Sequence, residues 1–480
     1  MRRVVIIGYG MAGARLAEEI RRRDPAGERV AVTAVGEEKH HPYNRVLLSS
    51  VVDGSLAAEA VTLQDADWAV EHAVDLRLGI GVTAVDRTTR TVFLADGSTI
   101  DYDVAVLATG ARAWLPPVDG LAGAGGAPAA GVLTLRTLDD CERVRHAAGT
   151  GGSVAVLGGG LLGVEAARAL AARGDRVTVV HPVAHLMERQ LDPTAGEVLA
   201  RVLDRLGVQV RAGARPTRYV PGRGLELAGG GLVPADHVLV SAGVRPEVGL
   251  AERAGLATDG GVLVDDALRT SDARVHAIGD CARHPGTVSG LVQPAWEQAA
   301  VLADLITGTD VSARYRGTPV VTRLKARDVD LVALGDARTR VDDPDAEVVC
   351  LTDFSRGRYA KLVVRDEEVA GAIVLGAPDV AAALTRFSDQ RLPVPADRLP
   401  LLLGRSGAAP GPGEWPDAGL VCRCNAVTKA ALVSAWHGGA RRVADLADAT
   451  RATTGCGGCV DRVRGLADWL SDREGDRAPA

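Results

Sequence analysis

The sequence has few aromatic residues, no excess of basic charge and no long apolar run. Aromatic side chains make up 3% of the 480 residues, and the formal net charge is −6. A negative balance excludes the basic surface that nucleic acids and anionic membranes attract, so neither is expected as a partner. Membrane-spanning helices need about 18 or more consecutive apolar residues, and no such stretch occurs.

The N-terminus also lacks the pattern of an export signal. The apolar run that follows Met1 stops at Gly8, and a charged segment with Glu18 and Glu19 comes next, without a cleavage-site context. We therefore expect a cytoplasmic protein. Hydrophobic residues at 47% and charged residues at 24% are typical of a packed globular chain, and the length predicts about three domains.

Residues 1–400 contain no closely spaced pair of cysteines. Cys141, Cys281 and Cys350 are scattered, whereas the other four of the seven cysteines crowd near the C-terminus. An odd total with one tight cluster indicates metal ligation in a reducing compartment, in contrast to the disulfide framework of a secreted protein.

Glycine is abundant, with 57 residues, and its first motif predicts a dinucleotide site. Gly8, Gly10 and Gly13 form Gly-x-Gly-x-x-Gly between an expected strand and an expected helix, so a pyrophosphate would lie at the helix N-terminus. An acidic residue after the second strand should hold the adenosine ribose. Glu37 and Glu38 stand there, with Glu38 preferred; the alternative is a solvated strand-end carboxylate.

A second motif repeats this arrangement at Gly158, Gly160 and Gly163. Its second strand ends at His181, where an acidic residue would favour NADH; histidine does not exclude the 2′-phosphate of NADPH. Glu165, in the helix after the motif, could orient a nicotinamide, and the alternative is an exposed helical glutamate. Two such motifs in one chain are far more specific than one.

Each motif leads into a cluster of short strands that closes at a glycine turn, Thr109-Gly110 and Ala242-Gly243 respectively. The expected fold class is α/β, with two Rossmann-like dinucleotide-binding domains, one inserted in the other, a small α/β domain and a small helical cysteine module. The expected domains are 1–115 with 244–315, 116–243, 316–403 and 419–472, and the Pro/Gly-rich residues 404–418 form a flexible linker.

The cysteine module supplies four thiolates from two loops, through Cys422-x-Cys424 and Cys456-x-x-Cys459. Such a set can hold tetrahedral zinc or a [2Fe–2S] cluster, and the spacing alone does not decide between them.

ATG at 108–110 and AIGDCA at 277–282, together with the two glycine motifs, resemble the FAD-dependent pyridine nucleotide-disulfide oxidoreductase superfamily. More narrowly, HHPYNRVLLSS at 40–50 and HPVAHLMERQLDPTAG at 181–196 resemble two groups within it. These are the FAD/NAD portion of assimilatory NAD(P)H nitrite reductase large subunits and the electron-transfer subunit of bacterial assimilatory nitrate reductase. The cysteine module resembles the bacterioferritin-associated-ferredoxin-like [2Fe–2S] domain, which favours iron–sulfur over zinc.

The resemblance implies FAD, NAD(P)H and a [2Fe–2S] cluster as cofactors, with NADH preferred by analogy. The residues it assigns to FAD are Gly8, Gly10, Gly13, Glu37, Glu38, Arg45, Thr109, Gly110, Gly279 and Asp280. Those assigned to NAD(P)H are Gly158, Gly160, Gly163, Glu165, His181 and Gly243. The cluster ligands are Cys422, Cys424, Cys456 and Cys459. No side-chain acid or base is named as catalytic, because none is needed to pass electrons from NAD(P)H to flavin.

The implied activity is a relay from NAD(P)H through FAD to the cluster, with the module swinging on its linker toward a partner. The expected partner is the catalytic subunit of an assimilatory nitrate reductase. A nitrite reductase catalytic chain is the second candidate, because the sequence up to Ala480 does not include the sirohaem-binding region of a complete nitrite reductase. Disulfide reduction is disfavoured, because no cysteine pair accompanies the flavin; Cys281 is expected as an isolated buried cysteine. The alternatives are a ferredoxin- or rubredoxin-reductase-like enzyme and a non-enzymatic redox-sensing or zinc-bearing interaction protein.

Overall fold

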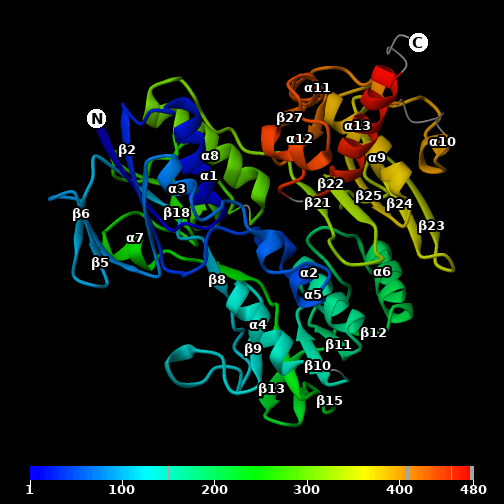
Figure 1. Ribbon diagram of the computed structural model, residues 1–480. Coiled ribbons are helices and arrows are strands. Elements are labelled where there is room, and N and C mark those ends of the chain that lie inside the picture. The colour runs from blue at the N-terminus through cyan, green and yellow to red at the C-terminus, as the bar shows by residue number, and fades with distance from the viewer. Residues whose placement is uncertain (150, 289, 406–410, 456, 476–480) are drawn as a thin grey trace.

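The computed structural model describes residues 1–149, 151–288, 290–405, 411–455 and 457–475 (Figure 1). Two parallel sheets, one antiparallel sheet and a small helical module follow one another, and the chain returns once to the first sheet. The expected α/β class is confirmed. The residue boundaries of the units stay predictions.

The first parallel sheet forms the core of the N-terminal nucleotide-binding unit. In spatial order its strands are β19 (Val275–Ala277), β7 (Val104–Leu107), β1 (Arg2–Ile7), β2 (Val30–Gly36) and β3 (Val74–Leu78). All neighbouring pairs are parallel, and the central strands are buried on both faces, which explains their continuous apolar sequences. Two helices, α1 (Met11–Arg23) and α8 (Val292–Thr307), pack against each other beside this sheet (Figure 1).

Smaller elements complete this unit. They are η1 (Arg45–Leu47), α2 (Leu48–Val52), η2 (Glu59–Val61), α3 (Trp68–Glu71), β4 (Val82–Asp86), β5 (Thr91–Leu94), β6 (Thr99–Asp101), α7 (Gly249–Arg253), β18 (Val262–Leu263), η4 (Gly279–Cys281) and β20 (Ala282–Arg283). Strands β4, β5 and β6 lie in the expected cluster of short strands and form an antiparallel sheet. The chain leaves the unit through β8 (Ala111–Ala113) and re-enters through β17 (Val244–Pro246), and these two strands pair antiparallel.

The second parallel sheet lies between β8 and β17 in the sequence. In spatial order its strands are β12 (Val208–Ala212), β11 (Arg176–His181), β10 (Ser153–Leu157), β16 (His237–Val240) and β9 (Val132–Thr134). Its other elements are η3 (Ala124–Gly126), α4 (Leu138–Ala147), α5 (Leu161–Ala172), α6 (Pro193–Arg205), β13 (Pro216–Val220), β14 (Gly224–Leu227) and β15 (Leu232–Pro234). One nucleotide-binding fold is therefore inserted into the other, as expected.

The third unit is an antiparallel sheet covered by a helix. Its spatial order is β21 (Val321–Arg323), β22 (Leu331–Gly335), β25 (Glu368–Leu375), β24 (Arg358–Arg365) and β23 (Glu347–Asp353). Helix α9 (Pro378–Gln390) packs on β25, and the short α10 (Leu399–Leu402) follows. Sequence patterns predict strands near residues 330, 348, 361 and 372, which correspond to β22, β23, β24 and β25; the short β21 is not predicted.

The C-terminal module is helical. It contains η5 (Pro412–Glu414), β26 (Leu420–Cys422), β27 (Val427–Thr428), α11 (Lys429–His437), α12 (Val443–Thr450) and α13 (Val460–Gly475). Its apolar core includes Trp296 of α8, so the module is docked on the N-terminal unit (Figure 1).

The expected linker is only partly described, because residues 406–410 lie outside the described residues. Its later part is packed: the Lys429 amine donates to the Trp415 carbonyl at 2.8 Å, and Gly413 lies against the Trp469 ring. The structure thus has the module docked on the N-terminal unit. Its swinging on the linker stays a prediction. Among the described residues, no helix combines the length and apolar character that crossing a membrane requires.

Candidate functional site

One cavity of about 880 Å³ receives residues from all four units. Thirteen sequence-predicted residues line it: Gly8, Gly10, Glu37, Glu38, Arg45, Thr109, Gly110, Glu165, Gly279, Asp280, Cys422, Cys424 and Cys459. The predicted residues of the second glycine turn, together with Gly13, His181 and Gly243, lie outside this lining. The first nucleotide turn and three cysteines therefore open into one space.

The first glycine turn has the geometry of a pyrophosphate cradle. Gly8 has φ +101°, and a Cβ there would lie 2.3 Å from the Ala108 carbonyl oxygen. A Cβ on Gly13 would lie 2.0 Å from the Gly8 oxygen, so only glycine lets α1 approach β1 so closely. A Cβ on Gly10 would meet nothing nearer than the Arg45 side chain at 3.6 Å. The helix N-terminus is thus open toward the cavity, where a phosphate would meet free backbone N–H groups.

Glu38, two residues after the end of β2, is held by two partners. Its carboxylate accepts the Tyr43 hydroxyl at 2.6 Å and forms an ion pair with Arg45. Burial raises the pKa of Tyr43, so the phenol stays a donor to this carboxylate at neutral pH. Glu37, by contrast, is exposed. Glu38 is therefore the better candidate for the ribose, as the sequence favours, and Tyr43 is a residue that sequence reasoning missed.

Asp280 is joined to the inserted unit by an arginine. The Arg136 guanidinium lies 2.5 Å from the Asp280 carboxylate, and Arg45 donates to the Arg136 carbonyl at 2.8 Å. The backbone N–H of Gly279 donates to the buried Gln298 side chain at 2.8 Å. Sequence reasoning missed Arg136 and Gln298. The only local signal for Arg136 is its place just before the capping box that Thr137 and Asp140 form at the start of α4.

The second glycine turn repeats the close packing of the first. A Cβ on Gly158 would lie 2.2 Å from the Ser241 carbonyl oxygen, and one on Gly163 would lie 1.9 Å from the Gly158 oxygen. A Cβ on Gly160 would meet nothing within 4 Å. The N-terminus of α5 is therefore a second open cradle.

The His181 ring is directed at the turn itself. Its Nδ1 accepts the Gly159 backbone N–H at 3.1 Å, and its Nε2 lies 3.0 Å from the Glu188 carboxylate. His181 is buried, whereas a third of the Glu188 side chain is exposed. Glu188 therefore provides a carboxylate near the end of β11, where this chain has a histidine in place of the acidic residue of the motif.

Glu165 is buried, so the alternative of an exposed helical glutamate is wrong. Its carboxylate accepts the backbone N–H of Lys325, in the third unit, at 2.7 Å. Burial raises the pKa of Glu165 to about 7. Near neutral pH this group can therefore carry a proton, and it can donate or accept a hydrogen bond in the cavity.

Thr109, Gly110 and Gly243 lie where the chain passes between the two nucleotide units. The Thr109 hydroxyl donates to the Glu247 carbonyl at 2.9 Å, and the Glu247 N–H donates to the Gly110 carbonyl at 2.9 Å. The Gly243 carbonyl accepts the Trp114 N–H at 3.0 Å. These contacts join the two chain segments that connect the nucleotide-binding units. Thr109 and Gly110 also line the cavity.

Three of the four module cysteines are described, and all three are buried. The Cys422 and Cys424 sulfurs lie 3.7 Å apart, and hydrogen bonds from Cys424 and Cys459 lower the pKa of the Cys422 thiol. Cys459 directly precedes α13, which begins at Val460. Cys456 lies outside the described residues, among which no group of three or more His, Cys, Asp or Glu side chains could hold a metal ion.

The backbone around these cysteines has an unfavourable conformation that directs N–H groups at a sulfur. Thr453, a β-branched residue, has φ +74°, and its backbone N–H is hydrogen-bonded to the Cys422 sulfur, as is that of Asn425. A Cβ on Gly455 would lie 2.5 Å from the Cys424 sulfur and 2.8 Å from the Trp296 ring. Thiolates surrounded by N–H donors fit an iron–sulfur cluster.

The other cysteines lie outside this group. Cys281 is fully buried, and its sulfur lies 3.4 Å from the Leu107 carbonyl oxygen. It is the isolated buried cysteine that the sequence predicts.

Family models match the chain in the same order as these units. Residues 2–299 match the pyridine nucleotide-disulphide oxidoreductase model. The chain belongs to the pyridine nucleotide-disulphide oxidoreductase family. Residues 320–387 of this oxidoreductase match the rubredoxin NAD+ reductase C-terminal domain, and residues 420–469 match the BFD-like [2Fe-2S] binding domain.

Relatives and solved structures agree with this assignment. The oxidoreductase is 32% identical to the assimilatory nitrate reductase electron transfer subunit of Bacillus subtilis, over 98% of this chain and 60% of that protein. It is 32% identical to a Bacillus subtilis nitrite reductase [NAD(P)H], over 96% of this chain and 57% of that protein. The chain thus spans less than two thirds of the length of these relatives.

A solved structure shows the same likeness in three dimensions. In the covalent putidaredoxin reductase–putidaredoxin complex, one chain superimposes with a TM-score of 0.73 at 26% identity, covering 85% of this chain and 99% of that chain. The family and domain matches give FAD, NAD(P)H and a [2Fe–2S] cluster as the cofactors of the oxidoreductase. Both open glycine cradles and the buried cysteines fit these groups.

Proposed function

We propose that this oxidoreductase carries electrons from NAD(P)H through FAD to a [2Fe–2S] cluster and on to the catalytic subunit of an assimilatory nitrate reductase. A nitrite reductase catalytic chain is the second candidate for the acceptor. We propose the cytoplasm as its location, because a reducing compartment keeps the ligating thiols free of disulfides.

The observation that carries the proposal is the shared cavity. Gly10, Asp280, Glu165 and Cys422 line one space, although they come from three different units. A group bound at the first glycine turn would therefore lie in the same space as Glu165, the proposed nicotinamide-binding residue, and the module cysteines. The internal electron step then needs no movement of the docked module.

Each cofactor would be held by its own set of residues. The first glycine turn, Glu38 and Asp280 would hold FAD, the second glycine turn and Glu165 would hold the nicotinamide dinucleotide, and the four module cysteines would hold the cluster. When bound, FAD accepts electron pairs and the cluster accepts single electrons, so together they divide a pair. The chain's contribution is binding and orientation. Glu165, whose pKa burial raises to about 7, is suited to the nicotinamide carboxamide because it can donate or accept a hydrogen bond.

We further propose that NADH is the preferred donor. Glu188, held by His181 at the end of β11, has the position and charge that bind a ribose 2′-hydroxyl and repel a 2′-phosphate. Replacing Glu188→Gln should reduce the preference for NADH over NADPH at least ten-fold in kcat/KM, with kcat for NADH little changed. Equal losses with both nucleotides would contradict this assignment.

Reconstitution tests the proposed partner. The purified holoprotein, mixed anaerobically with a nitrate reductase catalytic subunit, NADH and nitrate, should form nitrite at a rate that depends on both proteins. Omitting either protein is the control. No nitrite above the single-protein controls, while the chain still reduces ferricyanide, would exclude this acceptor and leave the flavin chemistry intact.

A soluble carrier is the alternative acceptor, and the likeness to putidaredoxin reductase over 85% of the chain favours it. Rapid NADH-dependent reduction of an added ferredoxin or rubredoxin, without nitrite formation on reconstitution, would select this alternative.

A further inference from the structure

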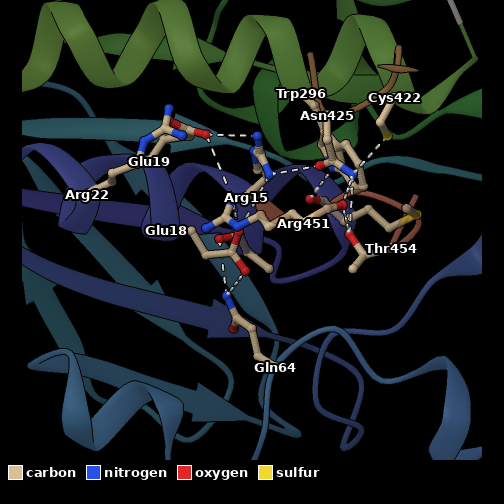
Figure 2. A network of polar contacts seen from close by, with 12 residues as sticks. Arg15, Glu18, Glu19, Arg22, Gln64, Trp296, Cys422, Asn425, Arg451 and Thr454 are labelled. Atoms are coloured by element: carbon tan, nitrogen blue, oxygen red, sulfur yellow. Dashed lines mark hydrogen bonds and ion pairs between the residues drawn. The ribbon is translucent and has the colours of Figure 1, made fainter. Parts of the chain in front are cut away.

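The buried amide of Asn425 contacts a cysteine sulfur on one side and the N-terminal unit on the other. Its Nδ2 donates to the Cys422 sulfur at 3.7 Å, to the Arg451 carbonyl at 2.5 Å and to the Thr454 hydroxyl at 3.3 Å. Its Oδ1 accepts from the Arg15 guanidinium at 3.2 Å. Figure 2 shows this chain of contacts from Arg15 through Asn425 to Cys422.

Arg15 belongs to α1, the helix that follows the first glycine turn. Arg15 is 8% exposed, and its guanidinium lies 2.9 Å from the Glu19 carboxylate and over the Trp296 ring at 5.2 Å. These contacts fix its position, so the amide of Asn425 meets a cation on a rigid helix of another unit.

Hydrogen bonds to a cluster's sulfurs help set its reduction potential, because they stabilise the extra negative charge of the reduced state. A cation at an amide oxygen polarises that amide and strengthens its N–H as a donor. The backbone donors to Cys422 come from within the module, whereas the Asn425 side chain is also tied to the N-terminal unit.

We propose that Asn425 raises the reduction potential of the cluster through its bond to Cys422, and that Arg15 is a positioning residue that acts through Asn425. The docking of the module on α1 then tunes the cluster as an acceptor for the flavin. This inference rests on the proposed ligation of the cluster by Cys422. It goes beyond that ligation, because it gives two residues that are not cluster ligands a role in setting the reduction potential of the cluster.

Redox titration of the full-length holoprotein, followed by the cluster's EPR signal, tests the proposal. Asn425→Leu removes the donor at similar volume and should disfavour cluster reduction by about ten-fold, which is about 59 mV for one electron. Arg15→Met should lower the potential by a smaller amount, and Arg15→Lys, which keeps a cation, should restore part of it.

The double variant separates two routes for Arg15. If Arg15 acts through Asn425, Arg15→Met has no further effect in the Asn425→Leu background. A direct effect of its charge on the cluster would persist there, and fully additive shifts would overturn the positioning role. Arg22→Met is the matched control, because Arg22 pairs with the same Glu19 but does not contact Asn425, and its potential should equal the wild type.

A merely structural role predicts a different result. Lower unfolding temperatures with unchanged potentials, in variants that keep their iron and sulfide, would overturn the proposal. If Asn425→Leu fails to assemble a cluster, the Arg15→Met and Arg15→Lys potentials decide, and equality with the wild type overturns the proposal. A wild-type protein without iron would instead remove the proposed function itself.

Discussion

The Glu165 carboxylate accepts the backbone N–H of Lys325 at 2.7 Å, so a helix of the inserted nucleotide unit and a loop of the third unit meet in the central cavity. The contact gives the buried Glu165 carboxylate a hydrogen-bond donor. It gives the cavity one group whose charge changes near neutral pH.

This group predicts a pH dependence of stability. Burial raises the pKa of Glu165 from 4.5 to about 7, so the folded protein holds a proton that the unfolded chain releases. The associated stability is complete below about pH 4.5 and is lost as pH rises through 7, by about 3 kcal/mol at most. Glu165→Gln should lack this loss, so its unfolding temperature should exceed that of the wild type most at about pH 8. Glu197→Gln, at an exposed position of α6, is the control; a Glu165→Gln profile parallel to the wild type would refute the shift.

Replacement of single module cysteines should separate the cluster from the flavin. Cys424→Ser and Cys459→Ser should reduce iron and acid-labile sulfide to background while the flavin absorbance remains, because the glycine turn that would hold FAD is in another unit. Cys281→Ser and Cys350→Ser should keep full iron content. Iron retained in both module variants, measured by elemental analysis, would show that these cysteines are not ligands.

The third glycine of each motif should control one nucleotide. Gly163→Ala places a methyl group against the Gly158 oxygen and should raise KM for NADH more than ten-fold with FAD content preserved. Gly13→Ala should instead lower FAD content. Gly465→Ala, where a Cβ meets nothing within 4 Å, should change neither. Loss of FAD from the Gly163 variant would mean that the two turns are not independent.

Docking of the module should control the internal electron step. The Arg451 guanidinium lies 2.7 Å from the Glu18 carboxylate, across the interface between the module and α1. Arg451→Asn removes this ion pair and keeps a residue tolerant of φ +63°. Stopped-flow measurements should show flavin reduction by NADH unchanged and cluster reduction slowed at least ten-fold. Arg464→Met, at an exposed pair within α13, should leave both rates unchanged, and a normal cluster rate in Arg451→Asn would argue against the docked arrangement.

The features that sequence predicts are those encoded locally. Gly13 and Gly163 are each required by packing against the first glycine of their own motif, and short motifs therefore locate both turns. Gly8 and Gly158 fit the same motifs, although the carbonyls that exclude a side chain there belong to Ala108 and Ser241. Cys422 and Cys424 are two residues apart, so their proximity is also local.

The features that sequence misses depend on contacts between distant segments. Arg136 reaches Asp280 across 144 positions, and Arg15 reaches Asn425 across 410. No local pattern specifies such pairs, because they arise only when the units pack. His181 shows the same limit: its place at the strand end is predictable, but its bond to the Gly159 N–H and its pairing with Glu188 are not.

The central claim is that electrons from NAD(P)H reach the module cysteines through the flavin, and an anaerobic titration tests it most directly. NADH and NADPH are added stepwise to the holoprotein while flavin absorbance and cluster EPR are followed together. The account predicts that NADH bleaches the flavin and produces the EPR signal of a reduced [2Fe–2S] cluster in the same chain. Bleaching of the flavin without any such signal, in protein that contains zinc and no iron, would contradict it.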